Sequence, residues 1–333
     1  MLQTVAYLRS LTPKARRQLV ETRELLHTGD GEYGLKPDRE GVLTVDAGGE
    51  RVNIHWYELG PEDPDAVTVV YVHGFNIAAE EFFLQTEAVA GHGVRQLLLD
   101  LRGHGQTGKV DPDLLTIDAA ADDVAAVMRE RNVRGPAIVV GHSLGGPISL
   151  SMMRRYHHEF NLAGSVQISS AVEPFTVQGL PQILAGPIGR FIEGVVAVTP
   201  HFAEGVRQVV TDMLTPILAL GFYFRPMSYQ LVQFHAAMIR ETPLETYAGY
   251  FEDLLHHSEL DAGEVLSTIP GYILVGDHDA VTPVSQSAKL HEIWPHAYMQ
   301  VLPESGHMPP LDAPGAVSTA INRLVQRITE DVK

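Results

Sequence analysis

The chain contains no cysteine among its 333 residues. It can therefore form no disulfide, no thiolate nucleophile and no cysteine-bound metal site. Basic residues are also few: 24 lysines and arginines stand against 41 aspartates and glutamates, which gives a net charge of −17. Because this charge repels phosphate groups, we expect no nucleic-acid partner.

Long apolar runs are missing as well. Residues 1–28 carry basic side chains such as Arg9 and Lys14 but lack the apolar centre of a secretory signal. The apolar run at 214–222 contains Pro216 and is too short to cross a bilayer. We therefore expect no integral membrane segment and a cytoplasmic location.

Short apolar runs alternate with helix-like segments from residue 42 onward, after a predicted N-terminal helix and linker in residues 1–41. Residues 42–45 and 52–59 predict an antiparallel strand pair joined by a Gly-Gly turn. Buried parallel strands are predicted at 67–72, 94–99, 137–140, 162–168 and 272–275, and helices at 80–90 and 116–131, the latter with Thr116 as its N-cap. This order predicts an α/β fold with a mostly parallel twisted sheet flanked by helices.

The most informative motif is Gly-His-Ser-Leu-Gly at residues 141–145, directly after an apolar run. A Gly-x-Ser-x-Gly between a strand and a helix places its serine on a sharp turn, where Oγ is exposed above the helix N-terminus. Glycines suit this turn because a Cβ atom would clash there. The context predicts that Ser143 is a nucleophile.

A serine hydroxyl needs a base, and the base needs an acid that orients it. His307 lies in a Gly/Pro loop after the strand-like residues 297–302, so it can face a nucleophile without being locked in a core. Acidic candidates follow the predicted strand 272–275, at Asp277 and Asp279.

Together these stretches resemble the lipase/esterase-type α/β-hydrolases, over residues 42–170 and 268–330. The resemblance rests on the serine motif, on Gly-x-x-Asp-x-x-x-Pro at 276–283, on Gly-His-x-Pro at 306–309, on His-Gly-Phe at 73–75 and on Asp-Leu-Arg-Gly-His-Gly at 100–105. Thr107 departs from the serine that the family commonly has in the turn after this last motif.

The resemblance implies a catalytic triad in an α/β-hydrolase fold, with Ser143 as nucleophile, His307 as base and Asp279 as acid. It also implies an oxyanion hole formed by the backbone N–H groups of Phe75 and Leu144. Asp277 lies two positions before the expected acid, and some relatives carry the acid after the sixth strand, where this chain offers Glu173. The spacing of the motif favours Asp279.

Residues 171–267 interrupt the alternation with Pro- and Gly-rich apolar sequence and helix-like segments at 229–240 and 246–257. They are expected to form a helical cap between two halves of the core, residues 42–170 and 268–333. Its apolar side chains predict an apolar substrate. The expected lining residues are Leu214, Leu218 and Phe222; Tyr223, Met227 and Tyr229 fit core packing equally well.

The resemblance thus implies a serine hydrolase that cleaves carboxylic esters with a medium or long apolar acyl chain, without a cofactor or a metal. A C–C bond hydrolase, an acyltransferase, a perhydrolase and a non-catalytic ligand receptor remain alternatives, and the oligomeric state is left open. Adjacent histidines at 157–158 and 256–257 point about 100° apart on a helix and are not expected to bind one ion. His142, Asp100, Arg102 and His104 are interpreted as structural.

Overall fold

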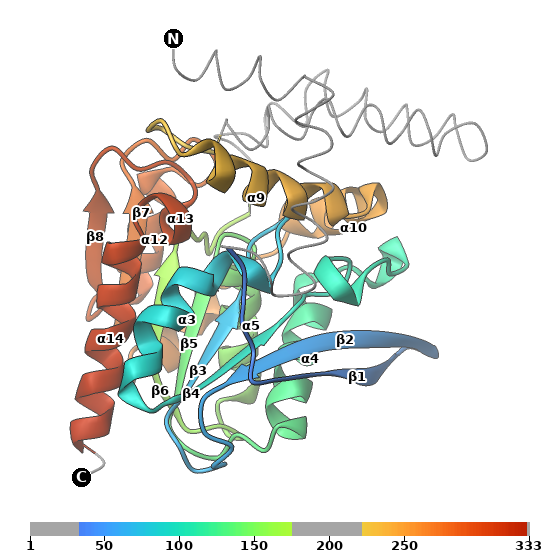
Figure 1. Cartoon of the computed structure of the whole chain (residues 1–333), viewed down its shortest axis with the longest axis horizontal. Coiled ribbons are helices and arrows are strands. Elements are labelled where there is room, and N and C mark those ends of the chain that lie inside the picture. The colour runs from blue at the N-terminus through green and yellow to red at the C-terminus, as the bar shows by residue number, and fades with distance from the viewer. Residues whose placement is uncertain (1–32, 175–221, 332–333) are drawn as a thin grey trace.

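The computed structural model describes residues 33–174 and 222–331, which are built around an eight-stranded sheet (Figure 1). The strands are β1 (Arg39–Ala47), β2 (Glu50–Leu59), β3 (Thr68–Val72), β4 (Arg95–Leu99), β5 (Ala137–His142), β6 (Leu162–Ile168), β7 (Gly271–Gly276) and β8 (Tyr298–Leu302). Their order in the sheet is β1-β2-β4-β3-β5-β6-β7-β8. Strands β3 to β8 are parallel, whereas β2 is antiparallel to both β1 and β4. The predicted mostly parallel sheet and the antiparallel leading pair are confirmed.

Both faces of the central sheet are buried, which explains the uninterrupted apolar runs. In β3, Val69 and Tyr71 belong to one hydrophobic cluster, and Val70 and Val72 to the other. This two-residue period is the alternation of side chains along a strand. The edge strand β1 alternates half-buried and exposed residues instead, and it begins at Arg39, three residues before the expected start. Only pairing with β2, in which Arg39 faces Glu58, decides that start.

Helices cover the two faces of the sheet (Figure 1). One face carries α3 (Phe83–Val89) and α14 (Pro314–Asp331), and the other carries α4 (Ile117–Glu130), α5 (Gly145–Tyr156) and α12 (Val284–Ile293). Short helical turns are η1 (Ala79–Phe82), η2 (Ala90–His92), η3 (Gly105–Thr107), η4 (Pro112–Leu114), η5 (Leu260–Ala262), α11 (Gly263–Leu266) and α13 (Pro309–Asp312). Thr116 caps α4 as predicted, since its side chain accepts a hydrogen bond from the N–H of Ala119. The sequence patterns missed α12 and α13.

Two helices of the expected cap are described, α9 (Tyr229–Glu241) and α10 (Leu244–Leu254), and they lie over the carboxyl ends of the parallel strands (Figure 1). α9 buries Leu231, Phe234 and Met238 in the same cluster as α3 and α14. α10 ends three residues earlier than expected, because a turn brings His257 toward Glu259. The predicted N-terminal helix and the expected lining residues Leu214 and Leu218 lie outside the described residues.

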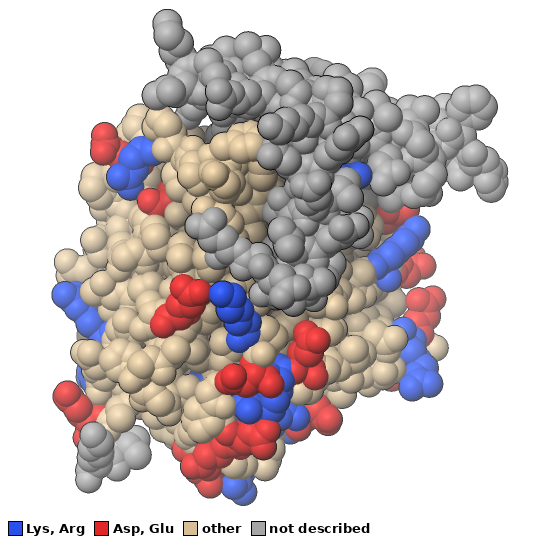
Figure 2. Space-filling model, viewed as in Figure 1, with Lys and Arg blue, Asp and Glu red and all other residues tan. Residues whose placement is uncertain are grey.

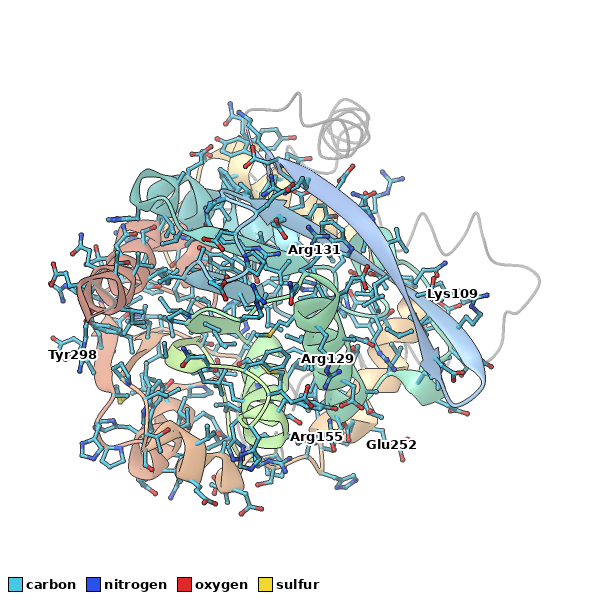
Figure 3. The ribbon with its side chains drawn as sticks, turned by 90° about the horizontal axis from the view of Figure 1, so that it is seen from below. Lys109, Arg129, Arg131, Arg155, Glu252 and Tyr298 are labelled. Atoms are coloured by element: carbon cyan, nitrogen blue, oxygen red, sulfur yellow. The ribbon has the colours of Figure 1, made fainter. Side chains whose placement is uncertain are left out.

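A buried acid at the amino ends of the strands ties the antiparallel edge to the core. Glu58 of β2 is fully buried, and its carboxylate lies 2.6 Å from the guanidinium of Arg95, 3.0 Å from that of Arg131 and 3.0 Å from that of Arg39. Arg131, seen from below in Figure 3, also stacks on Trp56 at 4.2 Å. Three cations offset the cost of burying one carboxylate, so this charge cluster has a structural role far from the carboxyl ends of the strands.

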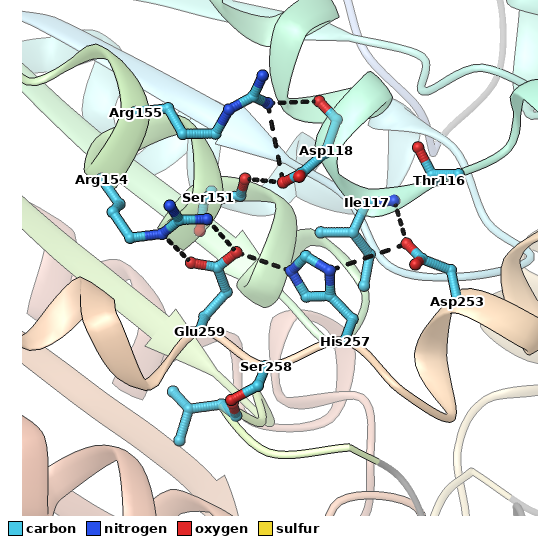
Figure 4. Close-up of polar contacts among 12 residues, drawn as sticks. Thr116, Ile117, Asp118, Ser151, Arg154, Arg155, Asp253, His257, Ser258 and Glu259 are labelled. Atoms are coloured by element: carbon cyan, nitrogen blue, oxygen red, sulfur yellow. Dashed lines mark hydrogen bonds and ion pairs between the residues drawn. The ribbon is translucent and has the colours of Figure 1, made fainter.

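An ion-pair network attaches the end of α10 to the core helices (Figure 4). His257 Nε2 lies 2.7 Å from Glu259, whose carboxylate also binds both Nε and Nη2 of Arg154 on α5, at 2.9 and 3.2 Å. The carboxylate of Asp253 accepts a hydrogen bond of 2.7 Å from the N–H of Ile117, at the start of α4. The network therefore determines where α10 sits above the sheet.

Three residues of this region have ligand-type atoms within 4.8 Å of one another: Asp118, His257 and Glu259. Arg154 already neutralises Glu259, and the hydroxyl of Ser151 donates to Asp118 at 2.6 Å. A cation placed here would lie beside a guanidinium. We therefore interpret the cluster as part of the ion-pair network.

The described surface on the face seen in Figure 2 has mixed charges, with acidic side chains beside basic ones among many uncharged residues. Arg129 binds the carboxylate of Glu159 at 2.7 and 2.9 Å. Among the described helices, none combines the length and the apolar character that crossing a bilayer requires.

Candidate active site

Ser143 stands at the turn between β5 and α5. Its φ is +51°, in the left-handed region that L-residues rarely adopt. The N–H of Ser143 donates to the carbonyl of Ile168 on β6 at 3.0 Å, which anchors the turn to the neighbouring strand. A Cβ atom at Gly145 would collide with the backbone of Val72 and His73, so only glycine fits there. The strained turn thus places the serine at the start of α5, where it lines a cavity.

The structure brings Ser143, His307 and Asp279 into one hydrogen-bonded chain. His307 Nε2 lies 2.9 Å from Ser143 Oγ. His307 Nδ1 lies 2.9 Å from Asp279 Oδ2 and 3.0 Å from Oδ1. The imidazole therefore stands between a hydroxyl and a carboxylate, which is the geometry that lets it accept the serine proton.

The loop after β7 holds the Asp279 carboxylate in place. Oδ1 accepts 2.8 Å hydrogen bonds from the N–H groups of Val281 and Thr282, and the Thr282 hydroxyl lies 2.9 Å from Oδ2. Burial raises the pKa of Asp279, but the facing His307 and these hydrogen bonds outweigh burial and hold the pKa below its usual value. Asp279 is therefore ionised in the folded protein at neutral pH.

The two other acid candidates face elsewhere. Asp277 accepts hydrogen bonds from His278 Nδ1 at 2.6 Å and from the N–H of Ser305 at 3.2 Å. The carboxylates of Glu292 and, more weakly, of Glu173 raise the pKa of the exposed ammonium of Lys289. Neither carboxylate is among the described contacts of His307.

The loop after β3 passes directly beside the serine turn. A Cβ atom at Gly74 would lie 2.9 Å from His142 Nδ1 and 3.2 Å from Ser143 Cβ. Phe75 follows Gly74, and both Phe75 and Leu144 line the cavity that contains Ser143. Within the described part of the chain, neither N–H group donates a hydrogen bond to a backbone carbonyl. Both are therefore available to an oxyanion.

An apolar cavity opens over the serine. Its walls come from the core and from the segments around α9 and α10: Phe75, Asn76, Ile77, His142, Ser143, Leu144, Phe222, His235, Phe251, Leu254, Leu255, Val281, His307 and Met308. Phe222, one of the three expected lining residues, lies here with its ring centroid 5.7 Å from that of His307. His235 is a polar member of the wall; burial lowers its pKa to about 3, so it stays neutral. The cavity thus places mostly apolar walls beside the Ser143 hydroxyl.

The motif at 100–105 supports this edge of the sheet without touching the serine. Asp100 accepts hydrogen bonds from Tyr57, Ala79 and Gln106 at 2.8–2.9 Å. Arg102 makes two 2.7 Å hydrogen bonds to Asp123 of α4. The Thr107 hydroxyl donates to the carbonyl of Asp100 at 2.7 Å and accepts from the N–H of His55. The hydroxyl of a threonine is therefore sufficient for both hydrogen bonds of this turn.

Sequence reasoning missed a buried pair behind the serine. His142 Nδ1 lies 2.8 Å from Glu81 Oε2, and both side chains are fully buried. His142 Nε2 lies 2.9 Å from the carbonyl oxygen of His307. Glu81 sits in an ordinary helix-like stretch of sequence, so no pattern signalled its place in the site. The position of His142 beside Ser143 was the only available signal.

Comparison with known proteins agrees with this architecture. The model of the alpha/beta hydrolase family matches residues 69–320. An esterase from Thermogutta terrifontis has the same fold, with a TM-score of 0.67 at 22% identity; the match covers 87% of this chain and 99% of that one.

Two curated relatives are informative. The chain is 28% identical to the dihydrolipoyllysine-residue acetyltransferase component of the acetoin cleaving system of Pseudomonas putida, over 78% of this chain and 63% of that protein. It is 35% identical to a bifunctional esterase/perhydrolase of Acinetobacter calcoaceticus, over 43% of this chain and 50% of that protein. This chain thus spans less than two thirds of the length of either relative.

Proposed function

This chain belongs to the alpha/beta hydrolase family, and we propose that it hydrolyses carboxylic esters with an apolar acyl chain through a Ser143 acyl-enzyme. The observation that carries the proposal is the hydrogen-bonded chain from Ser143 Oγ through His307 to Asp279, with 2.9 Å at each step. The similarity to esterases supports ester hydrolysis as the reaction.

In the proposed mechanism Ser143 Oγ attacks the ester carbonyl while His307 Nε2 takes its proton. The ionised Asp279 orients the imidazole and stabilises its charged form. The N–H groups of Phe75 and Leu144 donate to the oxyanion of the tetrahedral intermediate. His307 then protonates the leaving alcohol, and water, activated by the same base, releases the acid and restores Ser143.

A fluorophosphonate probe tests this proposal directly. We expect the probe to label one residue, Ser143, and to block hydrolysis of p-nitrophenyl esters in the same proportion. A matched incubation with EDTA should leave hydrolysis unchanged, since no metal takes part. Absence of labelling in folded protein would favour a non-catalytic receptor and would contradict the proposal.

Perhydrolysis is the second candidate, because one relative is named as both esterase and perhydrolase. The acyl-enzyme would be the same, and hydrogen peroxide would replace water in its breakdown. Peracid formation from an ester and hydrogen peroxide, measured beside ester hydrolysis, separates the two activities.

The walls of the cavity predict its selectivity. If the acyl chain lies against Phe251, Leu254 and Leu255, each buried methylene gains up to about 0.8 kcal/mol, which is about fourfold in kcat/KM. We therefore expect kcat/KM to rise from acetate until the cavity is full. Leu254→Asp should penalise long p-nitrophenyl esters at least about tenfold more than acetate, because a long acyl chain would exclude water from the new carboxyl group.

Leu260→Asp is the matched control, because Leu260 is 42% exposed and lies outside the cavity. It should leave the chain-length profile as in the wild type. A preference for acetate in the wild type would instead show that the substrate is small.

A further inference from the structure

We propose that Glu81 and His142 form a positioning pair that holds the loop of the base against the nucleophile, with His142 acting as an imidazolium. The proposal rests on the function proposed above, because it concerns how the same site is held together. Neither residue touches the reacting atoms. Their effect on the reaction would be exerted through the backbone of His307 and Gly74.

Both ring nitrogens of His142 face oxygen acceptors. Nδ1 lies 2.8 Å from Glu81 Oε2, and Nε2 lies 2.9 Å from the carbonyl oxygen of His307. A neutral imidazole has a single N–H and can donate to only one of them. Because both side chains are fully buried, a lone pair facing an acceptor would be costly. Only the imidazolium suits both contacts, because Nε2 then donates to the carbonyl while Nδ1–H, at ion-pair distance rather than in a hydrogen bond, faces the carboxylate.

Glu81 extends the connection to the oxyanion loop. Its Oε1 accepts a 2.9 Å hydrogen bond from the N–H of Gly74, the residue before Phe75. Within the described residues, Oε2 makes no hydrogen bond, so its 2.8 Å contact with His142 Nδ1 is an ion pair. The pair therefore links three loops that follow three different strands: the oxyanion loop after β3, the serine turn after β5 and the base loop after β8.

The electrostatic surroundings favour a charged His142. The titratable groups that face it are Glu81 on η1, His73 after β3, His235 on α9, Asp279 after β7, and His307 and Asp312 after β8. Burial lowers the pKa of His73 to about 4 and that of His235 to about 3, so both stay neutral. Burial also lowers the pKa of His142, but the Glu81 carboxylate and the His307 carbonyl outweigh it, and the pKa lies above the ordinary value of 6.5.

Loss of the His142 proton at high pH would weaken the site. The remaining proton stays on Nδ1 beside the carboxylate, so Nε2 turns a lone pair toward the His307 carbonyl. Because the folded-state pKa is raised, the contribution of the pair is complete below the ordinary histidine value and is lost as the pH rises through the folded-state pKa. We therefore expect kcat to fall on the alkaline side.

Glu81→Gln separates charge from hydrogen bonding. The amide of Gln can donate to Nδ1 and accept from Gly74, so a neutral His142 keeps its Nε2–H on the His307 carbonyl. In the wild type, kcat should fall about tenfold on the alkaline side with KM little changed, which is the loss expected for one buried hydrogen bond. In Glu81→Gln this alkaline fall should be absent. Glu81→Ala should lower kcat about ten- to a hundredfold at every pH. Glu87→Gln, on the exposed side of α3, is the control and should keep the wild-type profile.

Two further measurements keep the test decisive. NMR of the imidazole nitrogens in the wild type, followed as a function of pH, should show both nitrogens of His142 protonated at pH 6.5 and one of them losing its proton only above it. A single protonated nitrogen at pH 6.5 would overturn the proposal. An alkaline fall that persists in Glu81→Gln would also overturn it, as would variants that lower Tm without changing the kcat–pH profile. Failure of a fluorophosphonate to label wild-type Ser143 is a separate result, because it would overturn the proposed function itself.

Discussion

Ser143→Ala is expected to abolish ester turnover while leaving the protein folded. The hydroxyl is the proposed nucleophile, and removal of a triad member costs on the order of 10⁴–10⁶ in kcat. Truncation to alanine removes a single oxygen, whose hydrogen bond goes to His307. The measurement is kcat on a p-nitrophenyl ester, with thermal unfolding followed in parallel.

Ser149→Ala is a useful comparison, because Ser149 lies on the same helix and its hydroxyl donates to the carbonyl of Gly146 rather than to the triad. It should retain turnover. Near-normal hydrolysis by a folded Ser143→Ala protein would contradict both the nucleophile and the acyl-enzyme mechanism.

Asp279→Asn should produce the second large loss, about 10⁴-fold in kcat, because an amide can stabilise the wrong tautomer of His307. In the wild type, the N–H groups of Val281 and Thr282 donate hydrogen bonds to the carboxylate. In the variant they would face either the oxygen or the NH2 group of the side-chain amide, depending on how the amide is turned. The pKa of Asp279 lies below its usual value, so the wild-type group stays ionised through the assay range.

Asp277→Asn and Glu173→Gln provide controls of the same chemistry. Asp277 contacts His278 and Ser305, and Glu173 acts on Lys289, so each should change kcat by less than about tenfold. A large loss in Glu173→Gln together with a mild loss in Asp279→Asn would move the acid to the end of β6 and leave the fold unaffected.

Local sequence patterns were enough to predict the order of the core elements. Apolar runs such as 67–72 and 162–168 can be buried on both faces only inside a parallel sheet covered by helices, and the observed strands Thr68–Val72 and Leu162–Ile168 lie within them. The serine motif was equally readable, because a strand, a tight glycine turn and a helix are local features. Thr116 was identifiable as an N-cap for the same reason.

Contacts between residues far apart in the sequence could not be predicted from local patterns. The start of β1 at Arg39 depends on Glu58 across the sheet, and the choice among Asp277, Asp279 and Glu173 depends on which carboxylate faces a histidine on another loop. Glu81 and His142 lie 61 positions apart, and no periodicity links them, yet they meet because β3 and β5 are neighbours in the sheet. Contacts across the sheet follow from the packing of the whole chain, since hydrophobic burial selects the arrangement of strands and the polar partners are fixed only when that arrangement forms.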